Sequence, residues 1–170
     1  GIKILWGSEC DILGNGELDY PDDVLKKFDI VVAAVHSGFK MDEDKMTNRV
    51  IKAIKNENVD VLDHPTGRLL DRRPAYKIDL EKVFETAEET GTVFEVNSTP
   101  NRLDLNDANV INALRHGLKI VIDTDSHSSD QLKFINLGVS QARRGWAEAK
   151  DVVNTYSFEK LKKVFRKIKV

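Results

Sequence analysis

Leu118-Lys-Ile-Val-Ile-Asp-Thr-Asp-Ser-His-Ser128 is the stretch that decides the predicted fold. Its first half is an apolar, β-branched run that predicts a buried strand, and its second half is polar. Because strand side chains repeat every second residue, Asp125 and His127 are expected on the same side. A carboxylate and an imidazole, two metal-ligand types, therefore follow the C-terminal end of a strand.

Three further predicted strands lead to side chains of the same kind. The runs 1–6, 28–35 and 59–62 are mainly apolar, and each is followed by a carboxylate or an imidazole. Imidazole and carboxylate suit zinc, manganese or iron, and one carboxylate can bridge two cations. Since the carboxyl ends of parallel strands share one edge of a sheet, we expect the metal ligands to converge there. The predicted ligands are Glu9, His36, His64, Asp125 and His127.

Helical patterns alternate with the strands, which favours a parallel α/β fold. A fifth strand is expected over residues 92–96, ending at Asn97. No glycine-rich phosphate loop follows any strand, which counts against a nucleotide-binding open sheet, and polar residues at strand ends favour a barrel. Helices are expected over residues 21–27, after the caps Asp42 and Asp79, from Asp107, near 129–135 and 147–153, and over 157–168.

Composition narrows the possible functions. The chain has 170 residues, enough for one compact domain, and its net charge of -2 argues against binding nucleic acid through bulk charge. The single Cys10 cannot form an internal disulfide, which favours the cytoplasm. No apolar run approaches the roughly 18 residues of a membrane span, so no membrane partner is expected. The opening run 1–6 reads as a strand already under way, which predicts a fragment of a larger fold.

Two residues near these motifs are predicted to be structural. His116 falls in the last turn of a helix, where its cationic form is mildly favoured. Cys10 follows Glu9 and is expected to point to the opposite face of the strand, where it packs as a small apolar side chain.

The motifs resemble the later motifs of the PHP (polymerase and histidinol phosphatase) domain, most closely the C-terminal PHP domain of bacterial and archaeal family X DNA polymerases. Residues 18–22, 64–70 and 142–146 favour this subfamily over the histidinol phosphatases. The match covers nearly all of the chain, but the family's opening His-x-His motif and two further N-terminal histidines are absent from it. The resembling segments are residues 7–12, 35–37, 63–70, 97–105 and 124–128.

The resemblance implies a distorted TIM-like (β/α)7 barrel, of which residues 1–170 form an N-terminally truncated PHP domain. It also implies up to three manganese or zinc ions. Carried over by motif, Glu9 bridges two ions, and His36 and His64 complete the second site, which keeps all three of its protein ligands. Asp125 ligates the first ion and His127 the third, and each of those sites depends on missing residues.

The implied function is metal-dependent cleavage of phosphate esters at DNA 3′ ends, by attack of a metal-activated water, with Glu9 and Asp125 at the catalytic centre. The implied partners are DNA and a polymerase domain on the same full-length chain. Arg68 and Arg102 are candidates for gripping a phosphate, with structural ion pairs as the alternative. Asn97 is a candidate for binding the substrate or a metal-bound water.

Two other functions stay open. One is a small-molecule phosphatase of the histidinol phosphatase kind, and the other is a non-catalytic structural or DNA-docking module. Arg143 and Arg144 either contact a nucleic-acid backbone or belong to a solvated loop in which Trp146 packs as an anchor. The basic last helix is either an ordinary amphipathic helix or a DNA-facing stripe. For the chain by itself we expect weak activity or none.

Overall fold

A single parallel sheet organises the chain. The computed structural model describes residues 2–165, 167 and 168. The strands lie in sequential order, so each strand pairs with its neighbours in the chain and every connection crosses in parallel. This confirms the predicted parallel α/β fold. The strands are β1 (Gly7–Asp11), β2 (Ile30–Ala34), β3 (Val61–Leu62), β4 (Val93–Asn97) and β5 (Ile120–Asp123).

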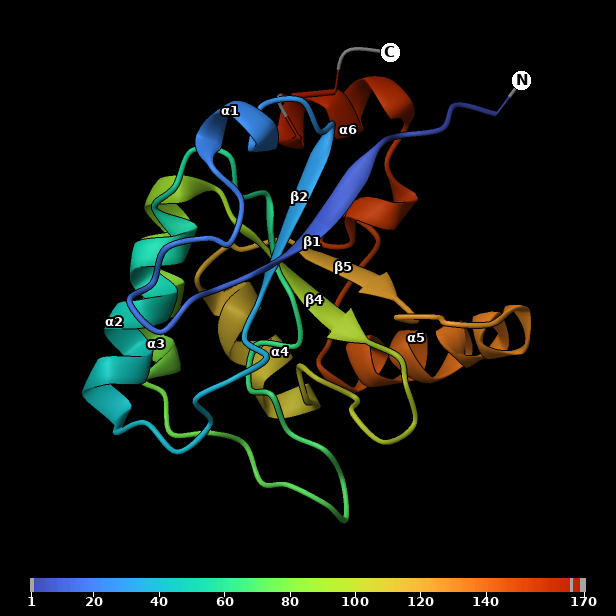
Figure 1. Cartoon of the computed structure of the whole chain (residues 1–170). Coiled ribbons are helices and arrows are strands. Elements are labelled where there is room, and N and C mark those ends of the chain that lie inside the picture. Colours follow the sequence, from blue (N-terminus) through green and yellow to red (C-terminus); the bar gives the residue numbers. More distant parts are fainter. Residues whose placement is uncertain (1, 166, 169–170) are drawn as a thin grey trace.

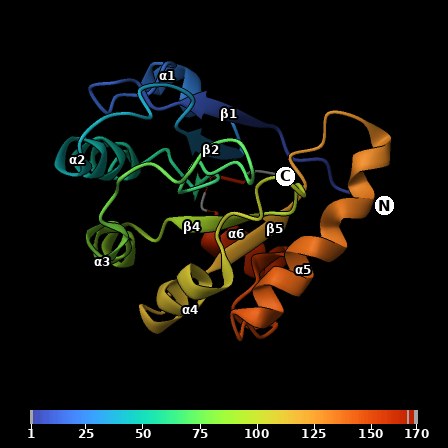
Figure 2. The ribbon, with the colours of Figure 1, turned by 90° about the horizontal axis from the view of Figure 1, so that it is seen from below.

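Helices cover one face of the sheet, and the end of the chain covers part of the other (Figures 1 and 2). On the first face lie α1 (Asp22–Leu25), α2 (Glu43–Ile54), α3 (Leu80–Thr90), α4 (Asp107–Arg115) and α5 (Ile135–Arg144). The 3-10 turn η1 (Ser129–Phe134) leads into α5, whereas η2 (Val153–Thr155) and α6 (Phe158–Val164) pack on the second face. Among the described residues, no helix has the length and apolar character needed to cross a bilayer.

Successive side chains along each strand point to opposite faces of the sheet. Cys10 and Phe94 are fully buried on the helix-covered face, in the larger core. Val61 and Val93 point to the second face and pack with Phe165 of the C-terminal segment. The prediction that Cys10 packs on the face opposite Glu9 is therefore confirmed. The second face is called the open face below, because polar side chains continue along it beyond the small apolar cluster.

Helix ends follow the capping residues seen in the sequence. The carboxylates of Asp42 and Asp79 accept hydrogen bonds from backbone N–H groups three residues on, as N-caps do. Gly91 ends α3 with φ 76°, a left-handed conformation that costs glycine little.

The prediction of a helix near residues 147–153 was wrong. Residues 147–152 contain a turn and an isolated bridge from Val152 to Ile120, and the structure instead places α5 directly after η1. Gly138 obscures the helical pattern of this segment because glycine is a poor helix former. The glycine is required by packing, since a Cβ at position 138 would lie 2.0 Å from the Ser98 hydroxyl oxygen.

The first strand lies later in the chain than predicted, and the last helix is shorter than predicted. Residues 2–6 are not in a strand, and Ile2 and Ile4 are 95% and 85% exposed, because no neighbouring strand pairs with them. Glu9 therefore lies in the middle of β1 rather than after a strand. The last helix ends at Val164 instead of 168, and the predicted cations Arg166 and Lys169 lie outside the described residues.

The apolar side of α6 packs on the sheet, as an amphipathic helix does. Phe158, Leu161 and Val164 join the smaller core. Lys167, beyond the helix, lies with its Nζ 2.7 Å from the buried carboxylate of Asp60. These contacts support the amphipathic interpretation, and a DNA-facing stripe stays a prediction.

Trp146 does not anchor the loop 143–146 by packing against the protein. Trp146 is 80% exposed, so its predicted packing was wrong. Its backbone turns outward with φ 61° directly after Gly145, where a Cβ would lie 2.4 Å from Val110. Arg144 forms an ion pair with Asp107 at 2.7 Å, and a contact of Arg143 with nucleic acid stays a prediction.

His116 joins α3 to α4. It caps the C-terminus of α4, its Nε2 lies 2.9 Å from Glu81 Oε2, and its Nδ1 contacts Glu88. Hydrogen bonds to Glu81 and then to Glu88 raise the pKa of His116. The imidazolium therefore stabilises the fold fully below the unfolded-state pKa of about 6.5, and this contribution disappears as the pH rises through the higher folded-state pKa.

We expect His116→Gln to lower the free energy of unfolding by about 0.5–1 kcal/mol near pH 6, the range for partly exposed ion pairs, and by much less near pH 10. Urea unfolding at both pH values measures the difference. His127→Gln is the control, because His127 is 82% exposed and lies away from both glutamates. Equal losses at the two pH values would contradict the ion-pair role of His116.

Candidate metal centre

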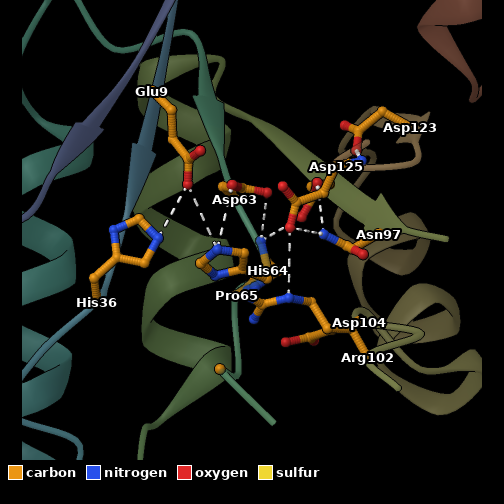
Figure 3. Close-up of polar contacts among 12 residues, drawn as sticks. Glu9, His36, Asp63, His64, Pro65, Asn97, Arg102, Asp104, Asp123 and Asp125 are labelled. Atoms are coloured by element: carbon orange, nitrogen blue, oxygen red, sulfur yellow. Dashed lines mark hydrogen bonds and ion pairs between the residues drawn. The ribbon is translucent and has the colours of Figure 1, made fainter. Parts of the chain in front are cut away.

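Three of the predicted ligands converge on the open face (Figure 3). Oε1 of Glu9 lies 3.1 Å from His36 Nε2 and 3.6 Å from His64 Nε2. Ligand atoms of the three residues all lie within 4.8 Å of one another. The three side chains come from β1 and from the segments that follow β2 and β3, so adjacent parallel strands bring them together although they are far apart in the sequence.

Short polar contacts fix both imidazoles. Nδ1 of His36 lies 2.6 Å from Asp11 Oδ1, also on β1. The backbone of His64 has φ 25°, and its N–H donates to Asp63 Oδ1 at 2.9 Å and to Glu95 Oε2 at 2.5 Å. The carboxylates thus hold the left-handed turn that aims the His64 ring at Glu9.

The cluster binds a proton strongly when no cation is present. The imidazoles of His36 and, less strongly, His64 beside it hold the pKa of the Glu9 carboxyl well below its usual range. The hydrogen bond to Glu9, aided by Asp11, raises the pKa of His36 to about 9 against the effect of burial. At neutral pH a proton therefore lies between Glu9 and His36, in the place where a metal ion would compete with it.

His64 provides the test of whether these residues fit a metal ion. Its side chain is 2% exposed, and in the described part of the chain neither ring nitrogen has a hydrogen-bond partner. An unsatisfied buried polar group costs about 1–3 kcal/mol, so native proteins rarely retain one without a reason. A cation bound at Nε2 removes that cost, and two imidazoles with one carboxylate are a ligand set that zinc and manganese accept. The residues therefore fit a divalent metal ion.

Sequence reasoning missed a row of carboxylates on the open face. Asp63, Glu95 and Asp123 follow Glu9 across β3, β4 and β5. Burial raises the pKa of Asp63 to about 6, and burial together with Asp63 raises the pKa of Glu95 well above its usual range. The signal was present in the sequence, because an acidic residue interrupts apolar strands at the positions that face away from the helices.

Asp125 belongs to a separate polar group with Asn97 and Arg102 (Figure 3). Its Oδ2 lies 3.3 Å from Asn97 Nδ2 and 3.6 Å from Arg102 Nε. Nη1 of Arg102 is buried and has no hydrogen-bond partner among the described residues. Asn97 is fully buried, and its Nδ2 also donates to Glu95 Oε1 at 3.2 Å, so the guanidinium of Arg102 is the part of this group left for an anion.

The remaining predicted residues lie at the edges of these two groups. His127 is 82% exposed, and its Nδ1 lies 2.8 Å from the backbone oxygen of Asp125. Asp125 and His127 do not join the three-residue cluster, because the chain leaves its extended conformation after β5 and Asp125 takes φ 46°. Arg68 donates through Nε and Nη2 to the backbone oxygens of Arg102 and Leu103, so it supports the loop that carries Arg102.

The sequence of this chain is similar to the sequences of several known proteins. No family model matches the chain. Over 158 residues the chain is 44% identical to the DNA polymerase/3′-5′ exonuclease PolX of Bacillus subtilis, covering 93% of this chain and 28% of that protein. The chain is a relative of the PHP-type part of family X DNA polymerases.

Other relatives of this PHP-type chain carry the name probable phosphatase. One from Caldanaerobacter subterraneus is 36% identical over 137 residues, covering 75% of this chain and 52% of that protein. One from Shewanella baltica is 39% identical over 102 residues, covering 58% of this chain and 38% of that protein. The chain thus spans 28% of PolX and 52% and 38% of these two phosphatases.

Proposed function

We propose that this chain is a metal-dependent phosphoesterase module that processes DNA 3′ ends, with 3′-5′ exonuclease activity, in a cytoplasmic family X DNA polymerase. The observation that supports this most is the convergence of Glu9 and His36 on the buried, unsatisfied imidazole of His64. The name of the PolX relative includes a 3′-5′ exonuclease, and the other relatives are named as phosphatases. Both activities cleave phosphate esters.

Glu9, His36 and His64 would hold a divalent cation, which would supply positive charge to the phosphoryl group and lower the pKa of nearby water. Side chains of this protein position the substrate. Arg102 binds a phosphoryl oxygen through its guanidinium, Asn97 positions the Asp125 carboxylate through its amide, and Arg68 holds the Arg102 loop in place. Asp125 and His127 would hold further manganese or zinc ions, up to three ions in the complete site.

Residues 1–170 form one PHP domain in this proposal, and the five strands are part of a distorted (β/α)7 barrel. The sequential strand order and the helices gathered on one face are what such a barrel requires. In the part of the chain that the structure describes, the outer edge of β1 pairs with no other strand, so it can accept another one. A His-x-His strand, which this sequence does not contain, would face Glu9 from that edge.

A small-molecule phosphatase is the second candidate, because several relatives are named probable phosphatases. A non-catalytic docking module is favoured only by the absence of Asp125 and His127 from the three-residue cluster. Substrate choice separates the three functions, since only the first releases nucleotides from DNA.

The test is release of the terminal nucleotide from a 3′-labelled DNA strand, with the chain in excess and with Mn²⁺, Zn²⁺ or chelator. We expect slow, Mn²⁺-stimulated release that falls more than about 100-fold in His64→Ala, because the lost imidazole is a direct metal ligand. His116→Ala is the matched control. Turnover of phosphomonoesters with intact DNA would favour the phosphatase, and metal binding without any cleavage would favour the docking module.

A further inference from the structure

Arg49 of α2 is a buried cation that reaches two loops at the metal centre. Its residue is 3% exposed. Nε donates to the backbone oxygen of Leu13 at 2.9 Å, Nη1 donates to that of Ser37 at 2.7 Å, and Nη2 donates to that of Ile12. One guanidinium thus satisfies three carbonyl groups from two separate segments.

No described carboxylate lies within ion-pair distance of Arg49, although it is buried. Burying a charged group is costly unless its donors are hydrogen-bonded, and the burial lowers the pKa of Arg49. A neutral side chain of similar length would fill the same space at lower cost. The three hydrogen bonds to backbone carbonyl groups are therefore the contribution for which a buried charged side chain is needed here.

Those carbonyls adjoin the metal ligands. Ile12 and Leu13 directly follow β1, which carries Glu9, and Ser37 directly follows His36. The guanidinium lies against the second loop closely enough that a Cβ on Gly38, which has φ 70°, would be 3.0 Å from Nη1. Arg49 therefore fixes the end of β1 relative to the end of β2, on which the 3.1 Å contact between Glu9 and His36 depends.

We propose that Arg49 is a positioning residue of the metal centre, which sets the separation of Glu9 and His36 without touching the ion. This inference rests on the proposed function, because it requires that Glu9, His36 and His64 bind a divalent cation. Residues that orient metal ligands typically change metal affinity about 10–100-fold when replaced. We expect a loss of that size for Arg49→Met, which keeps the length of the side chain and removes its donors.

Calorimetric titration of the chain with Mn²⁺ and with Zn²⁺ at constant pH tests the inference. Lys52→Met is the matched control, because it removes a cation of the same helix whose Nζ lies 3.3 Å from the exposed Glu17. We expect the affinity of Lys52→Met to equal that of the unchanged chain. Arg49→Lys keeps the charge but not the planar fork of donors, so we expect its affinity to fall by at least about threefold.

Rescue distinguishes positioning from simple destabilisation. Methylguanidinium added to Arg49→Ala occupies the vacated space, and we expect it to restore metal affinity without changing the affinity of Lys52→Met. If Arg49→Met does not fold, Arg49→Lys and the rescue decide the question. If Arg49→Lys keeps the metal affinity of the unchanged chain and methylguanidinium restores no affinity to Arg49→Ala, the positioning role of Arg49 is wrong. Metal binding by the unchanged chain would still support the proposed function in that case. An unchanged chain that binds no metal would overturn the proposed function itself.

Discussion

Glu9→Gln and His64→Ala are each expected to lower the affinity of the chain for Mn²⁺ or Zn²⁺ by more than about 100-fold, since even indirect neighbours of a metal ligand are worth 10–100-fold. Glu9→Gln keeps the shape of the side chain and removes the charge that both imidazoles face. His64→Ala removes the buried ring whose nitrogens make no hydrogen bond among the described residues, with Nε2 3.6 Å from Glu9 and 3.4 Å from Asp63.

Metal content after dialysis against a limiting concentration of each ion measures this effect. His116→Ala is the control, because it removes an imidazole that lies between Glu81 and Glu88, away from the centre. Circular dichroism shows whether each variant keeps its fold. The ligand assignment fails if the unchanged chain, Glu9→Gln and His64→Ala retain equal amounts of metal.

Phe94→Ala is expected to lower the free energy of unfolding by about 3–5 kcal/mol, the usual cost of deleting a buried aromatic side chain. Phe94 is fully buried on β4, and its ring lies 5.1 Å from that of Phe84 on α3 at an interplanar angle of 71°. This edge-to-face pair joins the sheet to its helical layer. The truncation leaves a cavity at that junction, because strand and helix are held by many other contacts and cannot close the gap.

Urea unfolding followed by circular dichroism gives the free energy for each variant. Trp146→Ala is the control of the same residue class, and we expect it to change the free energy by less than about 0.5 kcal/mol because the side chain is 80% exposed. If Phe94→Ala and Trp146→Ala cost the same small amount, the layer contact of Phe94 does not stabilise the fold as described.

Much of the fold was predictable because local chemistry and burial agree. The β-branched run 28–35 became β2, and the caps Asp42, Asp79 and Gly91 mark helix ends in the sequence as they do in the structure. The helix α5 was not predictable, because Gly138 is present for its close approach to Ser98 rather than for helix formation. Residues 2–6 look like a strand, yet a strand forms only where a neighbour pairs with it.

The candidate site was likewise predictable from the sequence only in part. Convergence of Glu9, His36 and His64 follows from adjacent parallel strands, and the sequence contains that information. The placement of Asp125 and His127 does not follow from alternation, because the backbone turns at Asp125. The contacts of Arg49 were hidden as well, since a cation on an amphipathic helix gives no sign of a carbonyl 36 residues away.

Cys10 gives the molecule a built-in reporter. It is the single thiol of the chain, it is fully buried, and burial raises its pKa. A thiol-reactive dye therefore labels it only when β1 detaches from the sheet, so the labelling rate measures how often that strand opens. Because Glu9 is its neighbour on the same strand, slower labelling in the presence of Mn²⁺ would record how firmly the ion holds β1 in place.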